Sequence, residues 1–194
     1  MAFEDKLTGI PKLLTNSREA PLLKAMERDA FSRLRVSDPE TIFDDMHLYG
    51  KNDGTNGVQH WIYDTAGSGS STYNTNEASV DLDVTTGSTD RVTKRTYRYF
   101  PYIPGKSSLL FLTAVLGQGE TGCEKRIGLF DDNNGIMFQE IDGTYGINIR
   151  TKTSGSVVNN AVTQANWNLD PMDGTGPSRL NLDFTKAQIF VVDF

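Results

Sequence analysis

The sequence is poor in cysteine, histidine and long apolar runs. Its 194 residues include one cysteine, Cys123, and two histidines, His47 and His60. A single cysteine excludes an intrachain disulfide, and neither histidine lies in a recognisable metal or triad motif. The longest apolar stretch, 109–116, is interrupted by Thr113 and is too short to span a bilayer. We therefore expect no membrane partner and, since no secretory signal is visible, synthesis in the cytoplasm.

An excess of basic residues is also lacking. The formal net charge is −6 at pH 7, which argues against a nucleic-acid partner because such proteins usually present a basic surface. Hydrophobic residues make up 37% of the chain, and glycine occurs 18 times. Together with abundant Ser, Thr, Asn and Asp, this composition favours strands and turns over long helices.

Helix-favouring residues are concentrated in residues 1–50, which we interpret as a partly helical N-terminal arm. A narrow apolar stripe in this arm consists of Leu22, Leu23, Met26, Phe31 and Leu34. Asp38 and Pro39 indicate the start of a second helix that ends near Met46. The stripe is too narrow to form a core alone. We expect residues 1–36 to dock on a partner, either another copy or a different protein; the alternative is that they pack on their own β domain.

The rest of the chain, 51–194, reads as a β domain. The strands that we expect cover 58–63, 79–84, 91–102, 108–116, 124–130, 136–141, 145–150, 157–162, 180–184 and 188–193, and 66–79 reads as an exposed loop or flap. Their number and spacing predict an antiparallel β-sandwich or jelly roll. The expected core residues are Leu110, Leu112, Ile127, Leu129, Phe138, Ile147, Ile149, Phe184, Ile189 and Val191. Because the chain stops within an apolar run, we expect the natural protein to continue beyond Phe194.

Motifs that resemble catalytic or binding sites fail in their context. Residues 117–122, GQGETG, match the dinucleotide fingerprint, but a strand is predicted where that fingerprint needs a helix. Residues 131–135, DDNNG, do not have the ligand spacing of a calcium loop and read as a hairpin turn. Asp81 and Asp83 are expected on a solvated strand face, and Cys123 as a small core residue. We expect no enzymatic activity, no catalytic residues, no metal site and no cofactor.

Two features are better candidates for binding. Basic and aromatic residues alternate with one another along 91–102, namely Arg91, Lys94, Arg95, Tyr97, Arg98, Tyr99 and Tyr102. Such a strand can serve as an interface or can stack on the sugars or bases of a ligand, and an interface is the interpretation we favour. The loop 167–177, WNLDPMDGTGP, is either pinned by a buried Trp167 or a binding loop, and we favour the anchor.

Four long blocks resemble one family of proteins. They are DAFSRLRVS (29–37), RYFPYIPGKSSLLFLT (98–113), KRIGLFDDNNGIMFQ (125–139) and WNLDPMDGTGPSRLNLDFTKAQIFVVDF (167–194). Each is similar to virion-associated structural proteins of marine tailed phages, with similar sequences in some large algal viruses. The resemblance implies a particle component, such as a fibre, tail or capsid-decorating protein, located in the virion. It carries over no catalytic residues.

From this resemblance we expect a self-associating structural protein that docks on other virion proteins. A trimer is expected by analogy with phage fibres and decoration proteins alone. The alternative is a receptor- or carbohydrate-binding module of a fibre, with a host surface glycan as partner. Exposed, clustered aromatic residues would favour that alternative, whereas two carboxylates from different strands facing one cleft would favour a glycan hydrolase.

Overall fold

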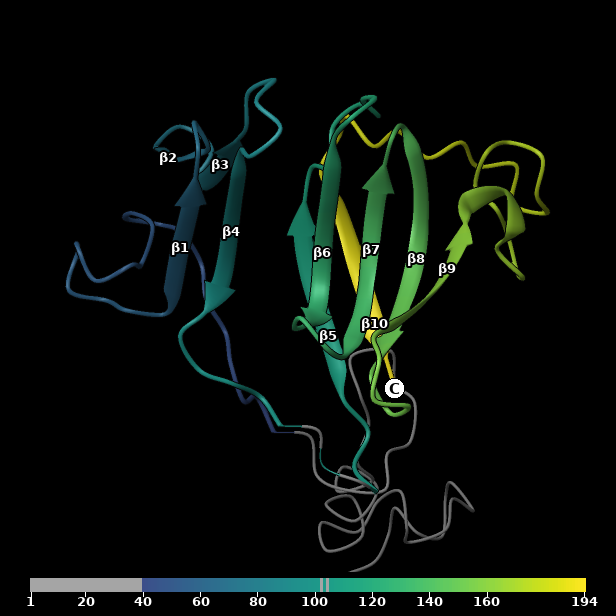
Figure 1. Cartoon of the computed structure of the whole chain (residues 1–194), viewed down its shortest axis with the longest axis horizontal. Coiled ribbons are helices and arrows are strands. Elements are labelled where there is room, and N and C mark those ends of the chain that lie inside the picture. The colour runs from purple at the N-terminus through teal and green to yellow at the C-terminus, as the bar shows by residue number, and fades with distance from the viewer. Residues whose placement is uncertain (1–39, 102, 104) are drawn as a thin grey trace, which may run out of the picture. The chain divides into compact units, whose positions relative to one another are not determined.

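A computed structural model describes residues 40–194 with the exception of 102 and 104, and the chain divides into two compact units (Figure 1). The first unit ends at Lys106 and the second covers Ser107–Phe194. This division differs from the boundary expected near residue 50. The apolar stripe of the arm, from Leu22 to Leu34, and Tyr102 lie outside the described residues. As expected, the fold is mainly β with antiparallel sheets.

The described part of the first unit contains two antiparallel strand pairs. Strand β1 (Trp61–Ala66) pairs with β4 (Arg91–Thr96), and β2 (Ser70–Asn74) forms a hairpin with β3 (Ser79–Asp83). The hairpin shows that the expectation of a loop or flap over 66–79 was wrong. The strand expected over 58–63 is displaced to 61–66, and the strand expected over 91–102 is shortened to 91–96. The expected apolar face of β3 is largely exposed as well, as Leu82 shows at 42%.

The second expected helix does not form over residues 40–46. This segment is extended, and burial alternates along it: Phe43, Asp45 and His47 are half-buried, whereas Asp44 and Met46 are exposed. Side-chain burial that repeats every two residues is typical of a strand-like backbone. Over 40–46 the helix does not form because the inward side chains bind β1 and β4, as described below; Asp38 and Pro39 lie outside the described residues.

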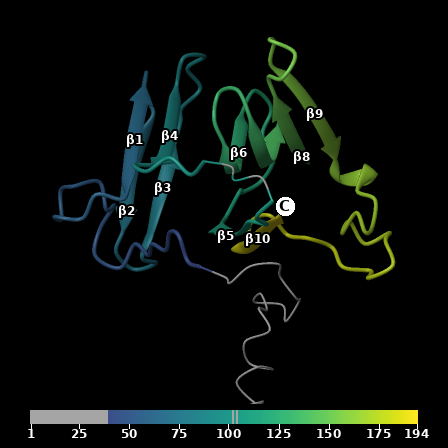
Figure 2. The same ribbon diagram turned by 90° about the horizontal axis from the view of Figure 1, so that it is seen from below.

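The second unit has six strands in two sheets (Figure 2). Four of them form the antiparallel sheet β6-β7-β8-β9, with bounds Glu124–Phe130, Gly135–Ile141, Thr144–Thr151 and Val158–Thr163. The other two, β5 (Leu109–Ala114) and β10 (Gln188–Asp193), pair with each other. A short 3-10 helix, η1 (Gln164–Asn166), follows β9. The expected strand over 180–184 is not formed apart from a single bridge at Asn181.

The core of the second unit lies between the four-stranded sheet and the β5–β10 pair. Phe138 of β7 and Phe190 of β10 contact each other, with ring centroids 4.8 Å apart. Phe184 stacks on Tyr145 at 3.7 Å and is buried as expected. Further partners are Leu112, Ala114, Leu116, Ile127, Trp167 and Leu182. Trp167 therefore anchors its loop, as we expected.

Several expected core residues lie elsewhere. In β10 the inward side chains are Phe190 and Val192, whereas Ile189 is 69% exposed and Val191 only half-buried. Apolar residues occupy both alternating positions of β10, so the pattern could not choose a face, and the contact with Phe138 decides it. Ile149 is 51% exposed. The expectation that 108–116 is buried on both faces was also wrong, because alternate residues of β5 are exposed.

Glu140 is fully buried in the second unit and holds the loop 117–122 on the turn after β7. Its Oε1 accepts hydrogen bonds from the backbone N–H of Gly143 at 2.5 Å and of Glu120 at 3.3 Å, and Lys125 Nζ lies 3.5 Å from Oε2. A Cβ at Gly119 would lie 2.7 Å from Gly143 Cα, so the glycine permits this close approach. Strand β6 follows the loop, which confirms that it lacks the helix of a dinucleotide site.

Hairpin turns built on aspartate recur in both units. Asp53 and Asp173 each precede Gly-Thr, and each Oδ1 accepts a 2.6 Å hydrogen bond from the threonine hydroxyl two residues later. The preceding residues, Asn52 and Met172, both have positive φ, 54° and 53°. The turn at 131–134 is likewise held by Asp131, whose Oδ1 accepts from two backbone N–H groups at 2.7 Å. This confirms the hairpin interpretation of that segment.

Candidate functional site

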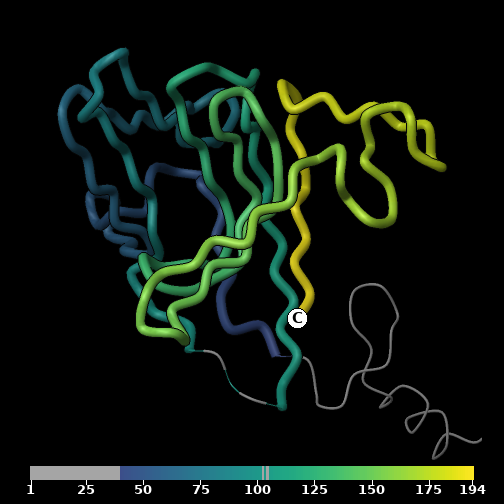
Figure 3. The backbone as a smooth tube through the Cα atoms, turned by 45° about the vertical axis from the view of Figure 1, so that its right-hand side comes forward, coloured from purple at the N-terminus to yellow at the C-terminus, as the bar shows by residue number. Residues whose placement is uncertain are grey.

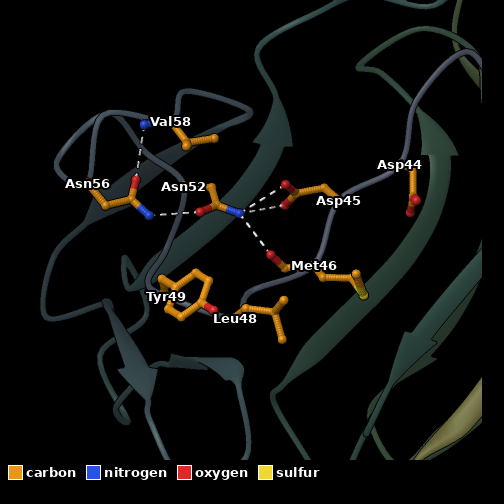
Figure 4. Close-up of a pocket in the computed structure, with 8 residues that line it drawn as sticks. All are labelled: Asp44, Asp45, Met46, Leu48, Tyr49, Asn52, Asn56 and Val58. Atoms are coloured by element: carbon orange, nitrogen blue, oxygen red, sulfur yellow. Dashed lines mark hydrogen bonds between the residues drawn. The ribbon is translucent and has the colours of Figure 1, made fainter.

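Asp45 is the centre of a partly buried hydrogen-bond network in the first unit. Its carboxylate accepts hydrogen bonds from His60 Nδ1 and Trp61 Nε1. It also accepts from Asn52 Nδ2 at 2.9 and 3.1 Å, as Figure 4 shows. The side chain is only 4% exposed. Burial alone would raise the pKa of Asp45, but the donors His60, Trp61 and Asn52 lower it below its ordinary value. The carboxylate is therefore satisfied as an anion inside the unit.

His47 and Lys94 form a second polar contact beside the same tryptophan. His47 Nδ1 lies 3.1 Å from Gly50 O, so it donates there, and Nε2 accepts from Lys94 Nζ at 2.5 Å. Lys94 Nζ also lies 4.1 Å from the centroid of the Trp61 ring, in cation–π geometry. Burial lowers the pKa of Lys94 to about 8, against the opposing effect of Asp45. Burial and then Lys94 lower the pKa of His47, which is accordingly neutral at pH 7.

Aromatic contacts fix the same segment from other directions. Phe43 packs edge-on against Trp61, with centroids 5.5 Å apart, and contacts Phe100 at 5.4 Å. The Tyr73 hydroxyl of β2 donates to the backbone oxygens of His47 and Leu48, both at 2.8 Å. Both strand pairs of the first unit thus hold the segment 43–48 in place.

This attachment turns Phe43, Asp45 and His47 inward and leaves several apolar side chains in solvent. Met46 is 65% exposed, Leu48 53% and Tyr49 88%. Together with other residues they line a shallow hollow of about 320 Å³ (Figure 4), whose lining is Asp44, Asp45, Met46, Leu48, Tyr49, Asn52, Asn56 and Val58. Asn56 Nδ2 donates to Asn52 Oδ1 at 2.9 Å, which ties one wall to the Asp45 network. The hollow is therefore a preformed surface with an apolar rim.

The Asp45–His60 pair has the form of an oriented general base. A base of this kind acts on a nucleophile within hydrogen-bond reach of the second ring nitrogen. Over the described part of the chain, no hydroxyl or thiol forms a hydrogen bond with His60 Nε2, and no group of three or more His, Cys, Asp or Glu side chains is arranged to hold a metal ion. The network is best understood as a support for the hollow.

The basic and aromatic residues of 91–102 are not brought together as one surface. Lys94 points into the network, whereas Arg95, on the opposite face of β4, pairs with Asp64 of β1 at 2.8 Å. Beyond the strand, Tyr97 and Tyr99 are 59% and 76% exposed. The remaining described members, Arg91 and Arg98, are exposed. The described residues of this set therefore lie on two faces with different surroundings, and their role as an interface stays a prediction.

Sequence reasoning missed the Asp45 network, and a signal for it is present. In the segment FDDMHL at 43–48, every second residue faces the same side of an extended backbone. Apolar Met46 and Leu48 share one side, and Phe43, Asp45 and His47 share the other. We interpreted the segment as a helix because a pairing of acidic, imidazole and aromatic groups on the inner face cannot be inferred without knowing that Trp61 and Lys94 lie opposite.

Comparisons with known proteins leave the family open: no family model, no curated protein and no solved structure matches the chain. No helix within residues 40–194, as far as they are described, is long and apolar enough to cross a membrane.

The neutral His47 predicts how stability depends on pH. Its folded pKa lies below 6.5, so the unfolded chain binds the proton more readily, and the first unit should lose stability as the pH falls below about 6.5. Lys94, with a folded pKa of about 8, is charged in both states below pH 7 and adds no slope there. We expect the urea midpoint, followed by Trp61 fluorescence in a Trp167→Phe background, to fall from pH 7.0 to 5.5. His47→Gln should reduce that fall; an unchanged fall would contradict the assignment.

Proposed function

We propose that this protein is a non-enzymatic structural component of a virus particle, a fibre, tail or capsid-decorating protein that self-associates and docks on another virion protein. The observation that carries the proposal is the segment 42–49, on which Ile42, Met46, Leu48 and Tyr49 are all more than half exposed. Asp45 and His47 of the same segment are half-buried and point to the network described above, whereas Asp44 is exposed. A soluble monomer rarely presents such a group of apolar side chains, and groups of this kind typically mark interaction surfaces.

The rigidity of the segment supports docking rather than incidental exposure. Asp45, His47 and Phe43 fix the backbone through hydrogen bonds and ring contacts to β1, β2 and β4. A surface that is already ordered loses little conformational entropy when a partner binds. The resemblance of four sequence blocks to virion-associated phage proteins supports the location in the virion.

For the second unit, the finer architecture that we propose is a two-layer β-sandwich in which β5 and β10 form the smaller layer; the jelly-roll arrangement stays an alternative. The Phe138–Phe190 contact supports the pairing of layers. We further propose that residues 1–36 are an arm that docks on a partner. The charged residues and the apolar stripe of this arm suit a partner surface that is partly charged and partly apolar.

Deleting residues 1–36 tests this function. We expect the truncated protein to keep its β circular dichroism spectrum and to be lost from particles, as measured by mass spectrometry of virions purified from cells that express only the truncated form. The full-length protein is the control. Normal incorporation of the truncated protein would rule out the docking arm, and a truncated protein that unfolds would show that the arm completes its own β domain. Absence of the full-length protein from purified particles would contradict the virion assignment itself.

A carbohydrate- or receptor-binding module is the second candidate. It is favoured by one observation, the exposure of Tyr97 and Tyr99 on the segment that follows β4, because exposed aromatic rings stack on the apolar faces of sugars. A glycan array with the wild-type protein and the Tyr97→Ala/Tyr99→Ala double variant separates the two functions. Binding that the double variant loses would support this candidate.

A further inference from the structure

The segment 42–48 presents an exposed row of side chains beside the hollow of the first unit. In an extended backbone every second residue faces the same side, so the row consists of Ile42, Asp44, Met46 and Leu48. Its three apolar members are more than half exposed, and Tyr49 and Val58 continue the apolar surface around the hollow (Figure 4). At the rise of an extended chain, the row is about 20 Å long.

The charge of this surface is negative. Two of the residues that line the hollow are carboxylates, Asp44 and Asp45, and none is a lysine or an arginine. Asp45 is satisfied by its own network, whereas Asp44 is exposed and makes no hydrogen bond or ion pair with a described residue. Glu40, which is also exposed, lies four residues before Asp44. The surface therefore suits a partner that is apolar and also carries positive charge.

A segment of this character occurs in the same chain, outside the described residues. It is the apolar stripe of the arm: Leu22, Leu23, Met26, Phe31 and Leu34. Basic residues outnumber acidic ones between its ends and directly after it, with Lys24, Arg28, Arg33 and Arg35 against Glu27 and Asp29. In the helix predicted from the sequence, the rise from the first to the last residue of the stripe is about 18 Å. The stripe thus complements the row in apolar character, charge and length.

The course of the chain favours a neighbouring copy as the source of the stripe. Figure 1 and Figure 3 both show the segment 40–49 leading away from the strands of the first unit towards its N-terminal end. The stripe ends at Leu34, so only residues 35–39 are available to reverse the direction of the chain and return the stripe to its own row. A neighbouring copy can accept the stripe without this reversal.

We propose that the stripe of one copy, 22–34, docks as a helix along the row 42–48 of a second copy. Its apolar side chains cover Met46 and Leu48, and its basic residues face Asp44. The contact joins two different surfaces, so it repeats from copy to copy and can close into a ring. The inference rests on the proposed self-association and names the two surfaces that perform it.

Two variants of the full-length protein, one on each surface, test the contact. Met26→Asp places a carboxylate in the stripe, and Met46→Asp places one in the row, where the side chain is 65% exposed. We expect the wild-type protein to be oligomeric by sedimentation equilibrium. Each variant alone should self-associate at least about ten-fold more weakly, since an unpaired charge is costly to bury. Mixed in equal amounts, the two variants should form a 1:1 complex, because one copy keeps an intact stripe and the other an intact row.

Two controls accompany the mixture. The double variant Met26→Asp/Met46→Asp should form no complex with either single variant, because neither mixture then has an intact stripe and an intact row on different copies. Val84→Asp places the same charge on an apolar side chain that is 44% exposed and does not line the hollow. This variant should self-associate like the wild-type protein.

Two results of the mixing experiment would overturn the inference. A stripe that docks on its own copy would leave the mixture of single variants unassociated, and a contact between two rows would be insensitive to Met26→Asp. A monomeric wild-type protein that is nevertheless found in purified particles would also overturn it, but the proposed virion function would stand, with a different virion protein on the row. Restored association in the mixture, together with absence of the protein from purified particles, would support the contact and contradict the virion function alone.

Discussion

Replacing Asp45 with alanine is expected to lower the free energy of unfolding of the first unit by about 3–5 kcal/mol, the usual effect of removing one partner from a buried charged network. The substitution leaves the indole N–H of Trp61 and the amide of Asn52 without their acceptor in a buried place. It also removes the carboxylate that partly offsets the unfavourable burial of Lys94. Urea unfolding followed by Trp61 fluorescence measures the change.

Asp44→Ala is the matched control, since Asp44 is the adjacent aspartate and is exposed. A substitution of this kind usually changes stability by no more than about 0.5 kcal/mol. Similar losses for the two variants would show that the Asp45 network does not hold the segment. A loss confined to Asp45→Ala, accompanied by loss of particle incorporation, would connect the network to docking.

In the second unit, Glu140→Ala is expected to cost about 3–5 kcal/mol for the same reason. The carboxylate is fully buried, and its removal leaves the N–H of Gly143 without its acceptor and Lys125 without its ion-pair partner. The readout is urea unfolding followed by Trp167 fluorescence, with Trp61→Phe as background. Trp167 packs against the core of this unit.

Glu124→Ala provides the comparison within the same sheet. Glu124 is 54% exposed and pairs with Arg126 at 2.7 Å on the surface, a contact worth less than about 1 kcal/mol. If both glutamate variants unfold at the same urea concentration, Glu140 does not organise the loop 117–122. A larger loss for Glu140→Ala would show that burial, and not the ion pair alone, determines its importance.

Sequence patterns predicted the parts of the fold that depend on neighbouring residues. The meander β6–β8 appears with nearly the expected bounds, because its turns at 131–134 and 142–143 carry strong local signals. Where the outcome depends on distant residues, prediction failed: β10 offered two apolar faces, and only the ring of Phe138 selects Phe190 over Ile189.

The candidate site could not be predicted from the sequence for a related reason. Asp45 and His60 are 15 positions apart, and His47 and Lys94 are 47 apart. Neither spacing follows a motif, so each residue alone resembled an ordinary polar side chain. The aromatic partners were also ambiguous, because Trp61 begins a strand whose buried face was not assigned. Only the three-dimensional arrangement shows why the segment 43–48 is extended.

The order of strands along the chain has a consequence for the way the second unit folds. Strands β6 to β9 each pair with the next one in sequence, so their contacts are local and can form early. Strand β5, at 109–114, pairs only with β10, at 188–193, and must wait until the intervening meander has formed and been synthesised. Non-local pairing is slow because the loop must close first. During synthesis, the apolar face around Phe138 is thus the longest-lived exposed surface and the place where chaperones are most needed.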